Sequence, residues 1–179
     1  MNNKFREAVL HIGLLTVIYC LAHWFLLILS GMWRDDWINV TGNQDVSAEL
    51  RMMLGLPLSG IINLPLKVIS YRPFTFLLFL LEGYLIYYIL KTLDFLSHRE
   101  AFWLSALYMI IPINDARVFR SCYKYSAGLF LFWAAFALAT VWVKKRGPVS
   151  YILRICTLGI LVLAYNTESI LLFTLLIAL

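Results

Sequence analysis

Two adjacent carboxylates, Asp35 and Asp36, lie between Trp33 and Trp37, five residues beyond the end of a long apolar run. Tryptophan rings favour the membrane–water interface, and a carboxylate held where water is scarce can act as a general base. The pair is therefore a candidate catalytic site. The alternative is that both are solvated loop charges beside an aromatic belt.

Four cations in polar segments are candidates for holding a phosphate or pyrophosphate group, namely Arg72, Arg117, Arg120 and Lys124. Arg72 precedes Pro73, so it could instead be a snorkelling arginine before a helix-starting proline. The other three could belong to an interfacial loop that turns after Pro112.

Three further acidic residues are weaker candidates: Glu82, Asp115 and Glu168. Glu82 lies in the middle of an apolar run, where an ionisable side chain is a functional candidate, although bonding to a neighbouring helix is a common structural use. Asp115 could simply help to form a turn. Glu168 follows Thr167, and the helix dipole favours a carboxylate in a first helical turn.

Motifs of soluble enzymes are missing from the sequence. It contains no glycine-rich phosphate loop, no His-Glu-x-x-His and no nucleophile elbow, and its three histidines are scattered. The three cysteines provide neither a paired framework nor metal-ligand spacing. We predict no metal ligand set, with a divalent cation between the carboxylates as an open alternative.

The composition indicates that lipid surrounds most of the chain. Hydrophobic residues make up 62% of the 179 positions, charged residues 14%, and the mean hydropathy is +0.81. The formal net charge is +5, but the basic residues lie in short segments between apolar runs. Lipid headgroups and phosphate-bearing lipids are therefore expected partners, and nucleic acid is not.

The apolar runs predict an all-α polytopic bundle in a single transmembrane domain, residues 1–179, with about six membrane segments. The segment 31–72 is a long external loop, in which Ser47 can cap a short interfacial helix. The run near 96–113 is short, so a tilted or re-entrant segment is the alternative. The final run has ten residues, which predicts a fragment of a longer protein. The expected spans are 8–30, 73–90, 96–113, 126–143, 149–165 and 168–179.

The orientation is predicted from the basic residues near the span ends. Eight fall on the side of the N-terminus and seven on the other side. Because that difference is small, the cluster from Lys144 to Arg146 and the N-terminal residues decide the assignment. They predict a cytoplasmic N-terminus, and the compact loops favour a bacterial cytoplasmic membrane.

The order of these features resembles the integral-membrane glycosyltransferases of the GT-C fold. The resemblance rests on Trp33 to Trp37 after a first span, on Tyr71 to Phe74 opening the second span, and on a short third span ending in Pro112. It also includes a polar loop with Arg117, Arg120 and Tyr125, and a span ending in Tyr165 to Glu168. It covers most of the 179 residues.

The resemblance implies that Asp35 or Asp36 is the catalytic base or lies beside it, and that Arg72, Arg117, Arg120 and Lys124 hold the phosphate of a polyprenyl-linked sugar donor. The implied reaction transfers the sugar to a hydroxyl of a glycan, lipid or protein acceptor on the extracytoplasmic face. Two alternatives remain at this stage: a transporter or lipid flippase, and a non-catalytic membrane subunit.

Overall fold

The computed structural model describes residues 3–24, 27, 71–93, 96–111 and 123–167. This part of the chain is all-helical, with five α-helices and no strand among the described residues. The helices are α1 (Asn3–His23), α6 (Tyr71–Thr92), α7 (His98–Ile110), α8 (Tyr123–Lys144) and α9 (Pro148–Thr167). The predicted helical class of the fold is confirmed over these ranges.

Three of the described helices are long and apolar enough to cross a membrane, over Phe5–His23, Pro73–Thr92 and Ser126–Lys144. A membrane helix needs roughly 20 apolar residues, because each residue advances the helix by about 1.5 Å. The chain is therefore a helical membrane protein. The predicted segment 168–179 lies outside the described residues, as does the external loop except for its last two residues, which begin α6.

The helix bounds differ from the predicted spans at three places. The first helix begins at Asn3, five residues before the predicted span from 8 to 30, and its described range ends at His23. The third helix, α7, has only 13 residues and begins after Ser97. The last described helix continues through Thr167, where the sequence predicted a break after residue 165.

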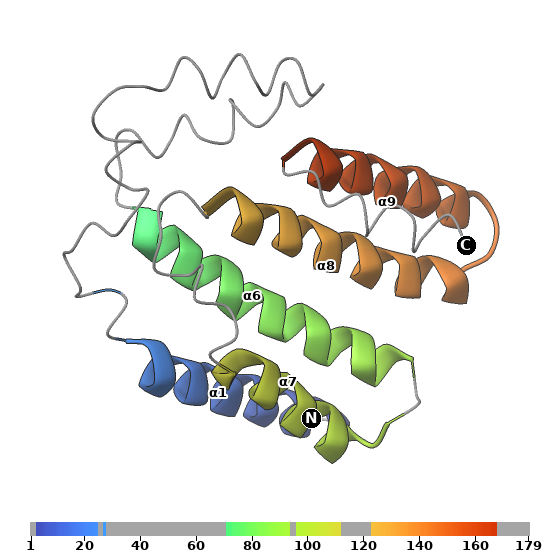
Figure 1. Ribbon diagram of the computed structural model, residues 1–179. Helices are drawn as coiled ribbons and strands as arrows, with labels where there is room; N and C mark the ends of the chain where they lie inside the picture. The colour runs from blue at the N-terminus through green and yellow to red at the C-terminus, as the bar shows by residue number, and fades with distance from the viewer. Residues whose placement is uncertain (1–2, 25–26, 28–70, 94–95, 112–122, 168–179) are drawn as a thin grey trace, which may run out of the picture.

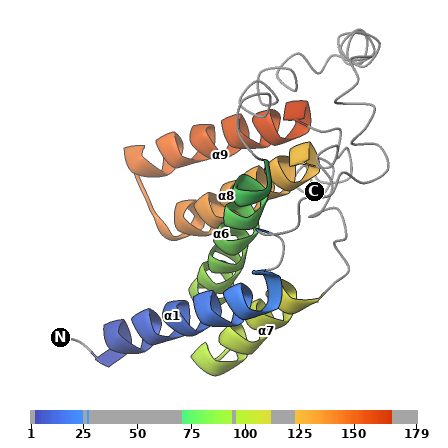
Figure 2. The ribbon, with the colours of Figure 1, turned by 90° about the vertical axis from the view of Figure 1, so that its left-hand side faces the viewer.

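The helices form a layered arrangement around α6 (Figure 1). On one side of α6 lie α1 and α7, which also contact each other, and on its other side lies α8. The outermost helix, α9, packs on α8. Figure 2 shows the same division from the side, with α1 and α7 separated from α8 and α9 by α6.

The directions of the helices follow from their contacts. Tyr19 bonds to Phe76 and His11 to Tyr87, so α1 runs antiparallel to α6. The Nζ of Lys144, the last residue of α8, donates to the carbonyl oxygen of Thr92, the last residue of α6. Both helices have 22 residues and run in the same direction, so their first residues lie toward the same end of the bundle (Figure 1).

A buried cluster joins α1, α6 and α7 around Tyr19, Phe79 and Met109, which are at most 2% exposed. Gly83 of α6 faces Met109 so closely that a Cβ atom there would overlap the methionine side chain. Small residues allow membrane helices to approach closely, and dispersion contacts then hold them together. The α6–α7 contact therefore depends on the missing side chain at Gly83.

Two local signals determine where α7 and α9 begin. The hydroxyl of Ser97 accepts from the backbone N–H of Glu100, and the Glu100 carboxylate accepts from the backbone N–H of Ser97, a capping box. Gly147 has φ +78°, which favours glycine, and Pro148 is the first residue of α9. Gly147 and Pro148 thus form the turn between α8 and α9.

Candidate functional site

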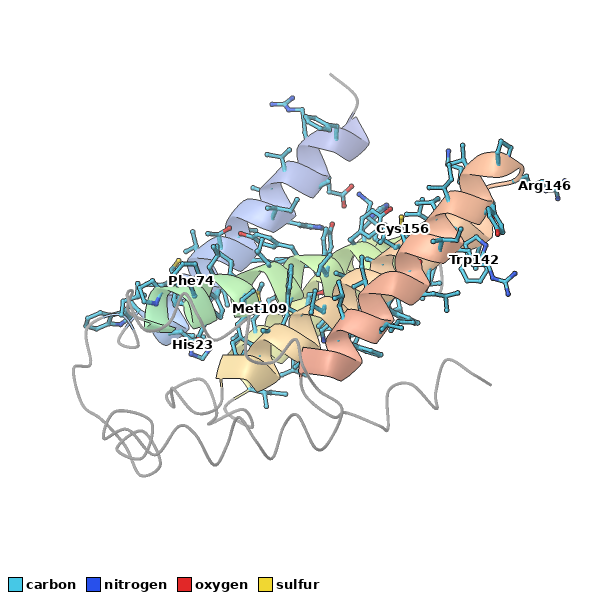
Figure 3. The ribbon with its side chains drawn as sticks, turned by 90° about the horizontal axis from the view of Figure 1, so that it is seen from above. His23, Phe74, Met109, Trp142, Arg146 and Cys156 are labelled. Carbon is cyan, nitrogen blue, oxygen red and sulfur yellow. The ribbon has the colours of Figure 1, made fainter. Side chains whose placement is uncertain are left out.

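One end of the bundle collects five helix termini. The C-terminal ends of α1, α7 and α9 and the N-terminal ends of α6 and α8 lie there (Figure 1). Figure 3 places His23, Phe74 and Met109 toward this end, and Trp142 and Arg146 toward the other. The segments 28–70, 112–122 and 168–179 all leave the described helices from this end, which we call the site end.

A small polar cluster joins three helices at the site end. Tyr19 donates its hydroxyl to the carbonyl oxygen of Phe76 at 2.9 Å, and the rings of the two residues are 4.7 Å apart. The Nε2 of His23 lies 2.7 Å from the carbonyl oxygen of Met109. A carbonyl only accepts, so Nε2 carries the proton and donates it. We call Tyr19, His23, Phe76 and Met109 the clamp.

The clamp determines where the chain leaves α1. His23 is the last residue of that helix and is 7% exposed, while Phe76 lies one helical turn beyond Arg72 on α6. The segment that carries Asp35 and Asp36 therefore starts beside the first turns of α6. Directional hydrogen bonds of this kind hold an element in one position more strictly than apolar contact alone.

Two predicted phosphate-binding residues occupy matching positions. Arg72 is the second residue of α6 and Lys124 is the second residue of α8. Because α6 and α8 run in the same direction and pack on each other, the backbones of Arg72 and Lys124 both lie at the site end. Arginine and lysine are residue types that bind anions with several oxygens, such as a phosphate.

Glu82 lies farther along α6 than Arg72. It is the twelfth residue of α6, roughly 15 Å along the helix axis from Arg72, and its side chain is fully buried. The hydroxyl of Tyr108 on α7 donates to Glu82 Oε2 at 2.8 Å. The structure therefore separates Glu82 from Arg72 along α6 and gives it an interhelical hydrogen bond to Tyr108, the neighbour of the clamp residue Met109. This is the structural use that the sequence left open.

A third helix completes the surroundings of this carboxylate. The ring of Trp133 on α8 lies edge-on to the ring of Tyr108, with centroids 6.1 Å apart. The indole Nε1 of Trp133 is buried and finds no hydrogen-bond partner among the residues that the structure describes. Glu82, Tyr108 and Trp133 thus join α6, α7 and α8 midway along the bundle.

The remaining predicted site residues lie outside the described residues: Asp35, Asp36, Asp115, Arg117, Arg120 and Glu168. Within the described ranges, no group of three or more His, Cys, Asp or Glu side chains lies close enough together to hold a metal ion. The open alternative of a divalent cation concerned Asp35 and Asp36, so this finding does not test it.

Sequence reasoning missed the histidines. His11 Nδ1 lies 2.8 Å from the hydroxyl of Tyr87, and His23 belongs to the clamp. Both were set aside because their spacing matched no ligand set. A polar side chain inside an apolar run was the available signal, since such groups usually find a partner on a neighbouring helix. The same signal identifies Thr16, which bonds to Tyr84.

Comparisons of the chain with protein-family models, with curated proteins and with solved structures give no match. The functional argument therefore rests on the residues and on the arrangement of the helices.

Proposed function

We propose that this chain is a membrane glycosyltransferase that moves a sugar from a polyprenyl-phosphate carrier to an acceptor hydroxyl. The observation that supports this most is the gathering of the helix termini at the site end. The connections that carry the acidic pair, the Arg117 and Arg120 segment and Glu168 all begin there, and Arg72 and Lys124 lie in the first turns of α6 and α8 at the same end.

The proposed chemistry needs one base and several cations. A carboxylate of Asp35 or Asp36 accepts the proton of the acceptor hydroxyl, and that oxygen forms a bond to the anomeric carbon of the sugar. The bond from the anomeric carbon to the carrier phosphate breaks, and its electron pair leaves with the phosphate. Arg72 and Lys124, together with Arg117 and Arg120, stabilise the charge on the departing phosphate.

The clamp supports this assignment because catalysis needs the base and the cations in a fixed relation. Tyr19 and His23 hold the end of α1 against α6 and α7. The connection with the acidic pair therefore starts at a fixed distance from Arg72. Glu82 has no catalytic role in this proposal.

The charges at the opposite end support an extracytoplasmic site. Lys91, Arg99, Lys144, Lys145 and Arg146 lie at or beside the helix termini of that end. Cytoplasmic segments carry an excess of Lys and Arg, so this end is cytoplasmic in our proposal, together with the N-terminus. The site end then faces outward, and a bacterial cytoplasmic membrane provides polyprenyl-phosphate sugars on that face.

The test uses membranes that contain the full chain and radiolabelled polyprenyl-phosphate sugars. Label transferred to glycan, lipid or protein is compared between the wild type and the variants Asp35→Asn and Asp36→Asn. Glu7→Gln is the matched control, because it also removes one carboxylate charge but lies at the opposite end, exposed on α1. We expect at least one Asp variant to lose about 100-fold or more of the transfer, as removal of a general base does.

Arg72→Gln and Lys124→Gln provide a second arm of this test. Each is expected to raise the KM for the donor, since each removes a phosphate-binding charge. Unchanged transfer in both Asp variants at normal protein levels, or no transfer by the wild type with any donor, would contradict the proposal.

The second candidate function is a transporter or lipid flippase, and Glu82 is the observation that favours it. A buried carboxylate midway through a membrane helix is typical of substrate and proton pathways. Glu82→Gln separates the two functions: a transporter would lose flux through the membrane, whereas the glycosyltransferase would keep its transfer activity once the amount of folded protein is matched.

A further inference from the structure

A group of basic residues lies at the turn between α8 and α9, at the end of the bundle opposite the site end. We call Lys145, Arg146 and Arg154 the basic tip. All three are exposed, and Figure 3 shows Arg146 at the extremity of this hairpin. The proposed function uses the charges of this end only to assign the orientation and gives them no ligand.

The basic tip has no acidic residue on its own two helices. The stretch from Tyr123 to Thr167 contains no Asp or Glu. The acidic residues that the structure describes elsewhere are Glu7, Glu82 and Glu100, of which Glu82 is fully buried and Glu100 bonds to Ser97. Among the residues that the structure describes, none of these carboxylates lies on the two helices that carry Lys145, Arg146 and Arg154.

The turn geometry keeps these cations together. The backbone N–H of Lys145 donates to the carbonyl oxygen of Trp142 at 3.0 Å, which continues the last turn of α8. Gly147, with its φ of +78°, reverses the chain, and the N–H of Ser150 donates to the Gly147 carbonyl oxygen at 3.0 Å. Lys145 and Arg146 are thus held beside the first turn of α9.

One aromatic contact indicates the depth of the tip. The guanidinium carbon of Arg154 lies 5.5 Å from the centre of the Trp142 ring, a cation–π contact between α9 and α8. Tryptophan favours the membrane–water interface, and a long basic side chain reaches from a span toward the headgroups. Both preferences place the tip at headgroup level.

The side chains around the cations are apolar and exposed. Val143 is 77% exposed, Tyr151 67% and Val149 53%. A free phosphate or an acidic peptide would leave these side chains in water. A lipid satisfies both features, since its phosphate meets the cations and its acyl chains cover the apolar side chains.

We propose that the basic tip binds the phosphate headgroup of an anionic phospholipid in the adjacent leaflet. Lys145 and Arg146 contact the headgroup, and Arg154 reaches it from the Trp142 ring. This site is independent of the donor site and would hold the α8–α9 hairpin at a fixed depth in the membrane.

The test uses the full chain in nanodiscs of phosphatidylcholine and phosphatidylglycerol, with the lipids retained on the released protein identified by native mass spectrometry. The wild type is expected to retain phosphatidylglycerol in excess of its share. Lys145→Gln/Arg146→Gln should lower that preference by about fivefold for each charge removed, the effect of roughly 1 kcal/mol per Lys or Arg at a membrane surface.

The matched control is Arg6→Gln/Arg99→Gln, which removes the same two charges from exposed positions on α1 and α7. This variant should retain the preference, as should the charge-conserving Lys145→Arg/Arg146→Lys, which also reports on folding. If both neutralised variants lost the preference for phosphatidylglycerol equally, the net charge of the protein would attract anionic lipid in general. That result would overturn the proposed site. Displacement of the lipid by inorganic phosphate, but not by chloride of equal ionic strength, would identify a free-phosphate site and also overturn it.

Discussion

The imidazole Nε2 of His23, the last residue of α1, donates a hydrogen bond to the carbonyl oxygen of Met109, the second-last residue of α7, over 2.7 Å. The carbonyls of a last helical turn have no N–H further along their own helix to accept from. His23 thus supplies from α1 a hydrogen bond to the last turn of α7. The bond joins two helix ends that are 86 positions apart in the sequence.

Replacing His23 by Ala should destabilise the protein by roughly 1 to 3 kcal/mol, because the Met109 carbonyl is then left buried without this donor. The measurement is unfolding of the detergent-solubilised protein by added SDS, followed by circular dichroism. His98→Ala is the control, since His98 begins α7 at the opposite end of the helix. Equal losses in the two variants would show that the interhelical bond adds no stability.

The bond between Tyr108 and Glu82 should show as a coupling energy in a double-mutant cycle with Tyr108→Phe and Glu82→Gln. We expect roughly 0.6 to 2 kcal/mol, the range of hydrogen bonds between membrane helices. The same SDS unfolding measures it. A coupling energy of zero would mean that Tyr108 and Glu82 contribute separately.

Gly83→Ala should destabilise the protein by about 1 to 3 kcal/mol, because the added methyl overlaps the side chain of Met109, which is 1% exposed and has little room to move. Adding Met109→Ala should lower the free energy of unfolding less in the Gly83→Ala variant than in the wild type, because the shorter side chain removes the overlap. Gly159→Ala is the control: a Cβ there meets no atom within 4 Å, so this variant should keep or gain stability. Equal destabilisation of the two alanine variants would contradict the steric explanation.

The N-terminus of α7 should depend on pH through Glu100, which lies outside the three long apolar helices. Hydrogen bonds from the side chain and then the backbone of Ser97 lower the pKa of the Glu100 carboxyl below its ordinary value of 4.5. A lowered pKa in the folded state means that the stabilisation is present above pH 4.5. It is lost as the pH falls through the folded value.

The measurement for this prediction is amide hydrogen exchange in the first turn of α7, corrected for the intrinsic pH dependence of exchange. Protection should decrease on acidification in the wild type. In Ser97→Ala it should be weak at every pH, because both the cap and the carboxylate's side-chain partner are lost. A wild-type protection that is constant between pH 6 and pH 3 would refute the role of the capping box.

The membrane helices themselves could be predicted because length and composition are local properties. The sequence predicted spans at 73–90 and 126–143, and α6 and α8 extend no more than three residues beyond those bounds. The end of the first helix could not be predicted in this way, because the apolar run continues past His23 to residue 30. Similarly, Ser97 was missed as the start of α7, although Ser-His-Arg-Glu has the spacing of a capping box.

The candidate site was predictable only in part. The sequence identified Glu82 by its charge in an apolar run, but its partner, Tyr108, is known only from the packing of α7 on α6. Arg72 and Lys124 were proposed from their residue types, and the structure shows that both begin helices at the same end of the bundle. The assignment of Asp35, Asp36, Arg117 and Arg120 stays a prediction.

The sequence by itself determined that this is a helical membrane protein, where the long apolar helices α6 and α8 lie, and where the basic turn between α8 and α9 lies. Only the tertiary structure decided that α6 lies between its neighbours, that His23 meets Met109, and that five helix termini share one end. The reason is that lipid is as apolar as the interior of the bundle, so an inward-facing side chain does not differ in hydrophobicity from an outward-facing one. The choice of neighbour then depends on close packing, as at Gly83, and on single hydrogen bonds between residues far apart in the chain.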